Sequence, residues 1–142
     1  MHLDRRPEGV TDETVEALGT MSEAVEWIER ARGRLYDFHQ MSGHADLLMG
    51  EAVDALRRAG HDEQADRLQQ EIIGRNVVEG RWTFQIVEDY DDHYWSAVRE
   101  ETAAVRDQLV GGTRHIFEAE MKADRITPGH PEHTPMPPTD RV

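Results

Sequence analysis

The side chains that could do chemistry gather in one stretch, Arg81 to Trp95. This stretch interleaves five aromatic residues with four acids and a histidine: Glu88, Asp89, Asp91, Asp92 and His93. Asp89 and His93 are four positions apart, so an α-helix would place both side chains on one face. Imidazole and carboxylate groups are the ligands that zinc, iron and manganese take in proteins. The pair therefore predicts one half of a metal site.

Two histidines of an earlier segment, His39 and His44, could supply the other half from a facing helix. The competing interpretation is that both are core residues, because Leu35, Leu47 and Leu48 are among their neighbours at helical spacing. Acids make up 29 of the 142 residues, so chance alone often places an acid three or four positions from a histidine, without any metal site. We therefore expect no cofactor, and keep a divalent metal ion bound by Asp89, His93, His39 and His44 as the alternative.

Other catalytic patterns are missing from the sequence. There is no cysteine, which excludes disulfides, thiolate nucleophiles and cysteine metal sites. The Gly111-Gly112 pair lacks both the lysine and the preceding strand of a phosphate-binding loop. No serine or threonine stands in a nucleophile-elbow pattern. The residues thus identify no reaction, and the prediction leans against an enzyme.

The charge of the chain restricts its partners. A formal net charge of −13 excludes a direct role on nucleic acid or anionic lipid, since both need a basic face. No apolar run approaches the length of a membrane span, and the first ten residues lack the apolar core of a signal peptide. We expect a cytoplasmic protein that acts on neither nucleic acid nor membranes.

The spacing of apolar residues predicts an all-α fold. A short helix is predicted to begin at Thr11 or Asp12 and to end at Gly19. Residues 21–59 carry the stripe of a long amphipathic helix, with Gly43 near its middle. Whether this segment is one helix or two stays open, and a long helix that is kinked or broken near Gly43 is favoured.

The second half of the chain repeats this pattern on a smaller scale. A helix is predicted to open at Asp62, and residues 77–87 fit either a small hairpin or a helix. From Arg81 an apolar stripe predicts a helix of about thirty residues, ending at Gly111-Gly112. A last helix is predicted over residues 114–126.

Three regions follow: a flexible N-terminal arm (1–11), a helical domain (12–126) and a Pro-rich disordered tail (127–142). We expect an antiparallel helical bundle, built on two long helices with shorter flanking helices. Two long helices leave an apolar stripe uncovered, which favours a homodimer that completes a four-helix core. The favoured function is a self-associating interaction or scaffold module, with a further protein as a candidate partner. The alternative is the metal-binding bundle, with hydrolytic or oxygen chemistry.

Overall fold

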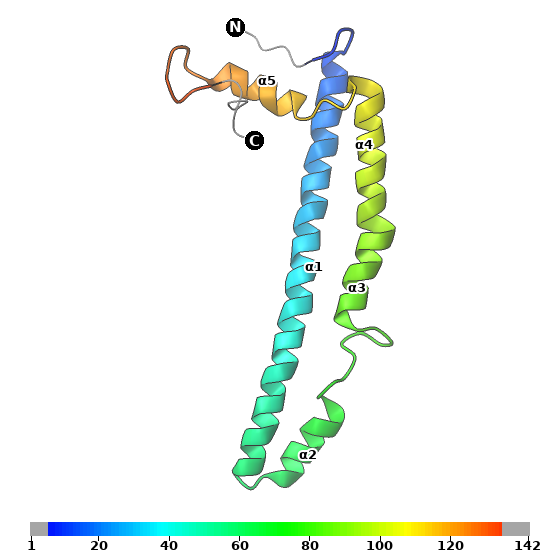
Figure 1. Ribbon diagram of the computed structural model, residues 1–142, viewed down its shortest axis with the longest axis vertical. Coiled ribbons are helices and arrows are strands. Elements are labelled where there is room, and N and C mark those ends of the chain that lie inside the picture. The colour runs from blue at the N-terminus through cyan, green and yellow to red at the C-terminus, as the bar shows by residue number, and fades with distance from the viewer. Residues whose placement is uncertain (1–5, 135–142) are drawn as a thin grey trace. The chain divides into compact units, whose positions relative to one another are not determined.

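The computed structural model describes residues 6–134, and over that range the fold is all-α, as predicted. In chain order the elements are α1 (Asp12–Arg58), α2 (Asp62–Glu71), α3 (Thr83–Tyr90), the π-helix η1 (Asp91–Trp95), α4 (Ser96–Val110) and α5 (Ile116–Arg125) (Figure 1). None of the helices within 6–134 combines the length and the apolar character that crossing a membrane requires. The bundle arrangement and the dimer stay predictions.

The chain divides into two compact units. Unit 1 comprises Met1–Trp27 and Ala97–Val142, and unit 2 comprises Ile28–Ser96. Helix α1 contributes its first part to unit 1 and its second part to unit 2. Each unit is described by itself below.

In unit 1, the start of α1 is as predicted but Gly19 does not end a helix. The Thr14 backbone N–H donates to the Thr11 hydroxyl at 3.2 Å, so Thr11 caps the helix. The helix then continues through Gly19, and the predicted stop there is wrong. A Cβ at this position would lie 3.0 Å from Cγ of Phe117. The glycine therefore allows α5 to approach α1 closely, at a position where the sequence pattern had predicted a helix end.

The core of unit 1 consists of Val15 from α1, Val110 from α4 and Ile116 from α5. Helix α4 ends at Val110, and the Gly111 and Gly112 that follow both have positive φ. Their N–H groups donate to the carbonyls of Asp107 and Arg106, the pattern of a glycine C-cap. The predicted end of the long helix at Gly111-Gly112 is therefore confirmed.

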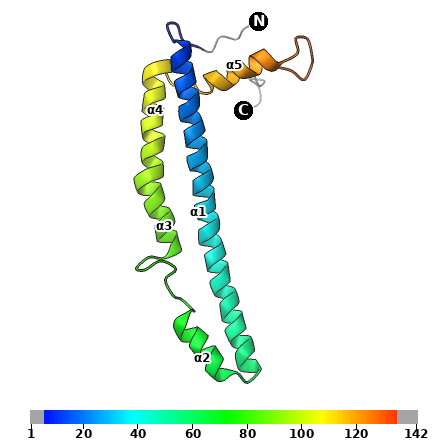
Figure 2. The same ribbon diagram turned by 180° about the vertical axis from the view of Figure 1, so that it is seen from behind.

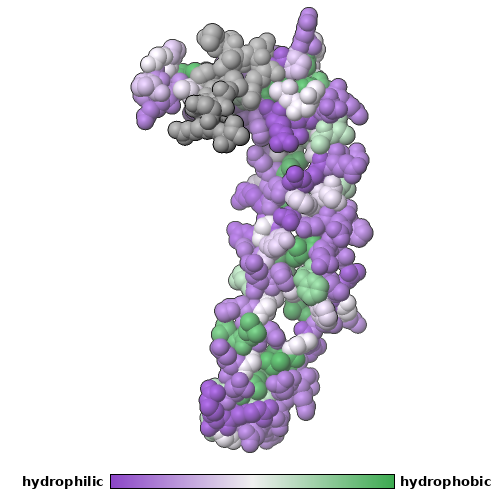
Figure 3. Space-filling view, in the orientation of Figure 1, coloured by the Kyte–Doolittle hydropathy of each residue, from purple (hydrophilic) through white to green (hydrophobic). Residues whose placement is uncertain are grey.

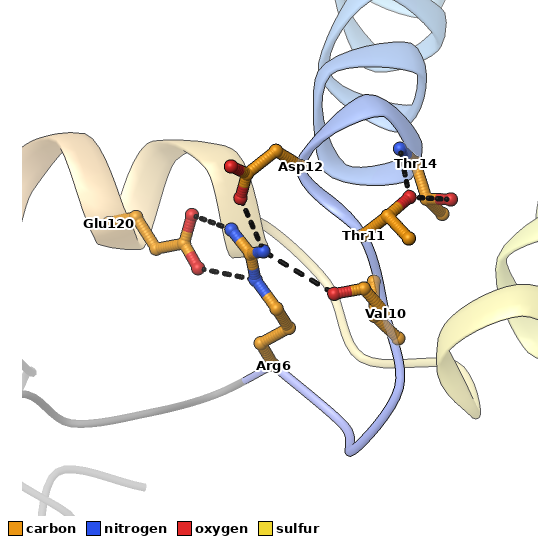
Figure 4. A network of polar contacts seen from close by, with 6 residues as sticks. All are labelled: Arg6, Val10, Thr11, Asp12, Thr14 and Glu120. Carbon is orange, nitrogen blue, oxygen red and sulfur yellow. Dashed lines mark hydrogen bonds and ion pairs between the residues drawn. The ribbon is translucent and has the colours of Figure 1, made fainter.

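An ion-pair network ties the segment before α1 to α5 (Figure 4). Arg6 donates to both carboxylate oxygens of Glu120, at 3.0 and 2.9 Å, and to Asp12 at 2.7 Å. The hydrogen bond to Glu120 is the main reason that the pKa of Arg6 is raised. Arg6 belongs to the arm predicted over 1–11, of which residues 1–5 lie outside the described range. Of the predicted tail, residues 127–134 form turns, and 135–142 lie outside that range too.

In unit 2, α1 passes through Gly43 without a break, so residues 21–59 do not form two helices. The predicted break is wrong. No atom lies within 4 Å of the position that a Cβ on Gly43 would take. The glycine is thus tolerated inside the helix, at a cost of about 1 kcal/mol relative to alanine.

The rest of unit 2 returns along α1 (Figures 1 and 2). After a turn at Gly60, α2 folds back so that Val53 of α1 and Ala65 of α2 are both buried. The segment 77–87 contains parts of both predicted alternatives: an isolated bridge joins Val78 to Arg81, and a helix begins at Thr83. The helical run from Thr83 to Val110 matches the predicted long helix, except that five residues of it are π-helical.

Candidate interaction surface

The acid-rich stretch singled out by the sequence forms α3 and, over its last five residues, the π-helix η1, both within unit 2. Asp91, the first residue of η1, accepts two hydrogen bonds from the Arg32 guanidinium of α1, at 2.7 and 2.9 Å. Such a bidentate pair is among the strongest polar contacts in proteins. The hydrogen bond from Arg32 lowers the pKa of Asp91 and correspondingly raises the pKa of Arg32. The charge of Asp91 is therefore used to hold η1 against α1.

Aromatic rings complete this contact. The Arg32 guanidinium lies 4.1 Å from the Trp95 ring centroid and 5.0 Å from that of Tyr36. The Trp95 indole N–H donates to the Glu29 carboxylate at 2.8 Å. Cation–π contacts of this kind add to the ion pair where the groups are partly shielded from water. We interpret this cluster as a structural contact, because the polar groups of Arg32, Asp91 and Trp95 are used within unit 2.

The four predicted metal ligands lie in different environments. Asp89 forms an ion pair with Arg81, and His39 Nδ1 is hydrogen-bonded to the Thr83 hydroxyl at 2.7 Å. His44 and His93 are exposed. The α-helical spacing of Asp89 and His93 is interrupted because α3 ends at Tyr90 and His93 belongs to the wider π-helix. Across 6–134, no three His, Asp or Glu side chains come together as a group that could hold a metal ion. The remaining support for the metal hypothesis is the spacing of these residues in the sequence.

A groove of about 480 Å³ opens in unit 2 between α1 and the segment that joins α2 to α3. Met49, Ile72, Val77 and Trp82 are the large apolar side chains that line it. One wall is fixed by Asp46, whose carboxylate accepts the Gly74 backbone N–H at 3.1 Å. Ile72, which directly follows α2, is 40% exposed and lines this groove.

Exposed apolar side chains are concentrated in unit 2. Of the sixteen large ones on the described part of the chain, eleven belong to this unit: Tyr36, Phe38, Met41, Leu47, Leu48, Ile72, Val77, Val78, Trp82, Phe84 and Tyr94. Figure 3 shows apolar residues in several groups among hydrophilic ones on the face that it presents. Single exposed apolar residues are ordinary, whereas a continuous row of them marks an interaction site.

Such a row runs along α1. Phe38, Met41 and Leu48 are 37%, 69% and 49% exposed, and the exposed alanines at 45, 52 and 55 continue their spacing. We name this row the α1 seam: Phe38, Met41, Ala45, Leu48, Ala52 and Ala55. Alternate steps of three and four residues are the a and d positions of a coiled coil. The seam therefore has the spacing of a helix-pairing surface, and its residues are exposed in unit 2.

A second stripe of α1, one residue further along, is covered within unit 2. It includes the half-buried His39 and Asp46 and the buried Val53. One residue corresponds to about 100° around an α-helix, so the two stripes lie on two adjacent sides of α1. Helices of four-helix bundles have this arrangement.

A single apolar stripe was predicted over residues 21–59, so the two stripes of α1 were not separated. Counting each stripe alone at three- and four-residue steps would have separated them. Arg32 was also missed. An arginine between Ile28 and Leu35 of the apolar stripe was the signal for a carboxylate partner at a partly buried position.

Comparison of the chain with protein-family models, with curated proteins and with solved structures finds no match. A function therefore has to be argued from the residues of the surface itself.

Proposed function

We propose that the chain is a self-associating interaction or scaffold module, and that it forms a homodimer through the α1 seam of unit 2. The observation that carries the proposal is the seam: six apolar positions at coiled-coil spacing, all with substantial exposure to water. Fully burying an exposed side chain of this size contributes about 1.5–3 kcal/mol, and the dimer would gain the part of this that corresponds to the exposed fractions of Phe38, Met41 and Leu48. Helix α1 of the second copy would cover the seam, which is the apolar stripe that unit 2 itself leaves exposed.

The two alternatives have less support. A metal-binding role would need ligands that come together, whereas Asp89 and His39 have Arg81 and Thr83 as their partners. An enzymatic role would need a nucleophile or an acid–base pair, and the acid with a perturbed pKa, Asp91, is held by Arg32. Self-association would account for the exposed apolar row on α1, which the internal contacts of unit 2 leave uncovered.

The test compares two methionine substitutions by sedimentation velocity at micromolar concentration. Met41→Glu places a charge in the seam, and Met121→Glu places the same charge on α5, where the side chain is also exposed at 50%. The wild-type chain should sediment with twice its mass of 16.3 kDa. Met41→Glu should sediment as a monomer, because a buried carboxylate without a partner opposes association, and Met121→Glu should remain a dimer.

Circular dichroism of both variants checks that the helices are kept. A strictly monomeric wild-type chain would overturn the proposal. A dimer unaffected by Met41→Glu would remove the α1 seam as its interface.

A further inference from the structure

We infer that the α1 seam pairs with the same seam of a second copy in antiparallel orientation, about a two-fold axis beside Leu47. This inference rests on the proposed self-association and adds to it an orientation and a register. It starts from the order of sizes along the seam, in which two large residues come first, an alanine and a leucine follow, and two alanines come last: Phe38, Met41, Ala45, Leu48, Ala52 and Ala55.

Antiparallel pairing places a large residue against a small one in every layer. Phe38 lies opposite Ala55 of the second copy, Met41 opposite Ala52, and Ala45 opposite Leu48. The two-fold axis then repeats each of these layers once, as an isologous interface requires. Layers of similar total volume can pack at the density of a protein interior.

Parallel pairing would give uneven layers instead. Phe38 would meet Phe38 and Leu48 would meet Leu48, while Ala45 and Ala52 would each meet a second alanine. A layer of two large residues crowds the helices, and a layer of two alanines leaves space between them. The order of sizes therefore favours the antiparallel orientation.

Charged residues along one edge of the seam select the register. Asp37, His44, Glu51 and Arg58 follow one another at intervals of seven, and all four are exposed. These are the positions that flank the core of a coiled coil and determine which partner it accepts. In the register above, Asp37 lies opposite Arg58 of the second copy, and His44 opposite Glu51. The first is an ion pair and the second an imidazole–carboxylate contact.

Neighbouring registers lose this complementarity. A shift by one heptad in one direction brings Asp37 opposite Glu51, and a shift in the other brings Glu51 opposite Glu51. Like charges at these positions oppose association. In a parallel pair the same acids would face Ser42 and Leu56, which carry no charge. The seam and its edge are thus complementary to themselves, so the occupant they fit is a second copy of this chain.

Charge reversal tests the register directly. Asp37 and Arg58 are 21 positions apart, which is about 31 Å along one helix, too far for an ion pair within one copy. Asp37→Arg and Arg58→Asp should each weaken the dimer about tenfold at low ionic strength, because each creates two like-charge pairs. The double variant should return to within about threefold of the wild-type dissociation constant, since it restores both pairs with reversed signs.

Glu16→Arg is the matched control, because it makes the same charge change at an exposed position of α1 that lies 21 residues before Asp37 and outside the seam and its edge. It should leave the dimer as strong as the wild type. A wild-type dimer that Met41→Glu dissociates, but whose double reversal is as weak as the single ones, would overturn the antiparallel register while self-association stands. A monomeric wild type would overturn both.

Discussion

The two units have similar numbers of described residues but bury their apolar side chains differently. Unit 1 has a closed cluster, in which Val15, Val110 and Ile116 from three helices contact one another. In unit 2, Val53, Ala65 and Val87 are buried but belong to no such cluster, and eleven large apolar residues remain exposed. Unit 1 thus has a closed apolar core, although some of its large apolar residues are exposed. Unit 2 leaves more of them exposed, and the proposed homodimer would cover those of the α1 seam.

Polar contacts differ between the units in the same sense. In unit 1 the Arg6 network supplements an apolar core that already joins the helices. In unit 2 the Arg32–Asp91 ion pair and the aromatic ring of Trp95 join α1 to η1. Specific polar pairs therefore position the helices of unit 2, and leave the α1 seam free for association.

The largest effect is expected from truncating a buried side chain in the core of unit 1. Val110→Ala should lower the free energy of unfolding by about 1–3 kcal/mol, because the side chain is 1% exposed and its loss leaves a cavity. Urea denaturation measures this loss, which should be equal at low and high protein concentration. Val105→Ala on the same helix is the control, since Val105 is 37% exposed. Equal losses for both variants would show that unit 1 has no closed core.

A smaller effect distinguishes the close packing of unit 1 from the open helix of unit 2. Gly33→Ala should raise the free energy of unfolding by about 0.5–1 kcal/mol, since no atom lies within 4 Å of the new methyl group. Gly19→Ala should instead lower it by about 1 kcal/mol, because the new Cβ would meet Phe117 at 3.0 Å. Thermal unfolding of both variants gives the comparison. Stabilisation by both would mean that Phe117 moves away without cost.

The smallest effect concerns the ion pair of unit 2 and its dependence on pH. Asp91→Asn should lower the melting temperature by a few degrees above about pH 5, where the wild-type carboxylate is charged. Because its folded pKa lies below the ordinary value of 3.8, the stabilisation is present above that value and is lost as pH falls through the folded pKa. Melting curves between acid and neutral pH should therefore converge at the acid end. A difference that is independent of pH would show that the amide loses packing rather than charge.

Much of the secondary structure could be predicted, because it depends on neighbours in the sequence. The Thr11 cap, the Gly111-Gly112 stop and the helix from Asp62 follow from local hydrogen bonding and backbone freedom. The two wrong predictions, at Gly19 and Gly43, share one cause. The sequence does not distinguish a glycine that ends a helix from one that allows a side chain such as Phe117 to pack closely, or from one that is simply tolerated. The difference depends on what packs against the glycine.

The candidate site was less predictable for the same reason. The stretch from Arg81 to Trp95 was recognised as the densest set of polar and aromatic groups, but its main partner, Arg32, lies 59 positions from Asp91. Asp89 and His93 were expected to share a helical face, and the π-helix alters that spacing. Ion pairs across such distances depend on how helices pack, and helical periodicity carries no information about them.

The sequence by itself determined that this protein is helical, where most of its helices begin and end, and that residues 21–59 carry an amphipathic pattern. These properties arise from interactions within a few residues, which periodicity and capping record. Only the tertiary structure decided which of the two stripes of α1 is covered, because burial depends on segments distant in the chain. The stripe through Val53 contacts the rest of unit 2, and the seam through Met41 and Leu48 faces solvent.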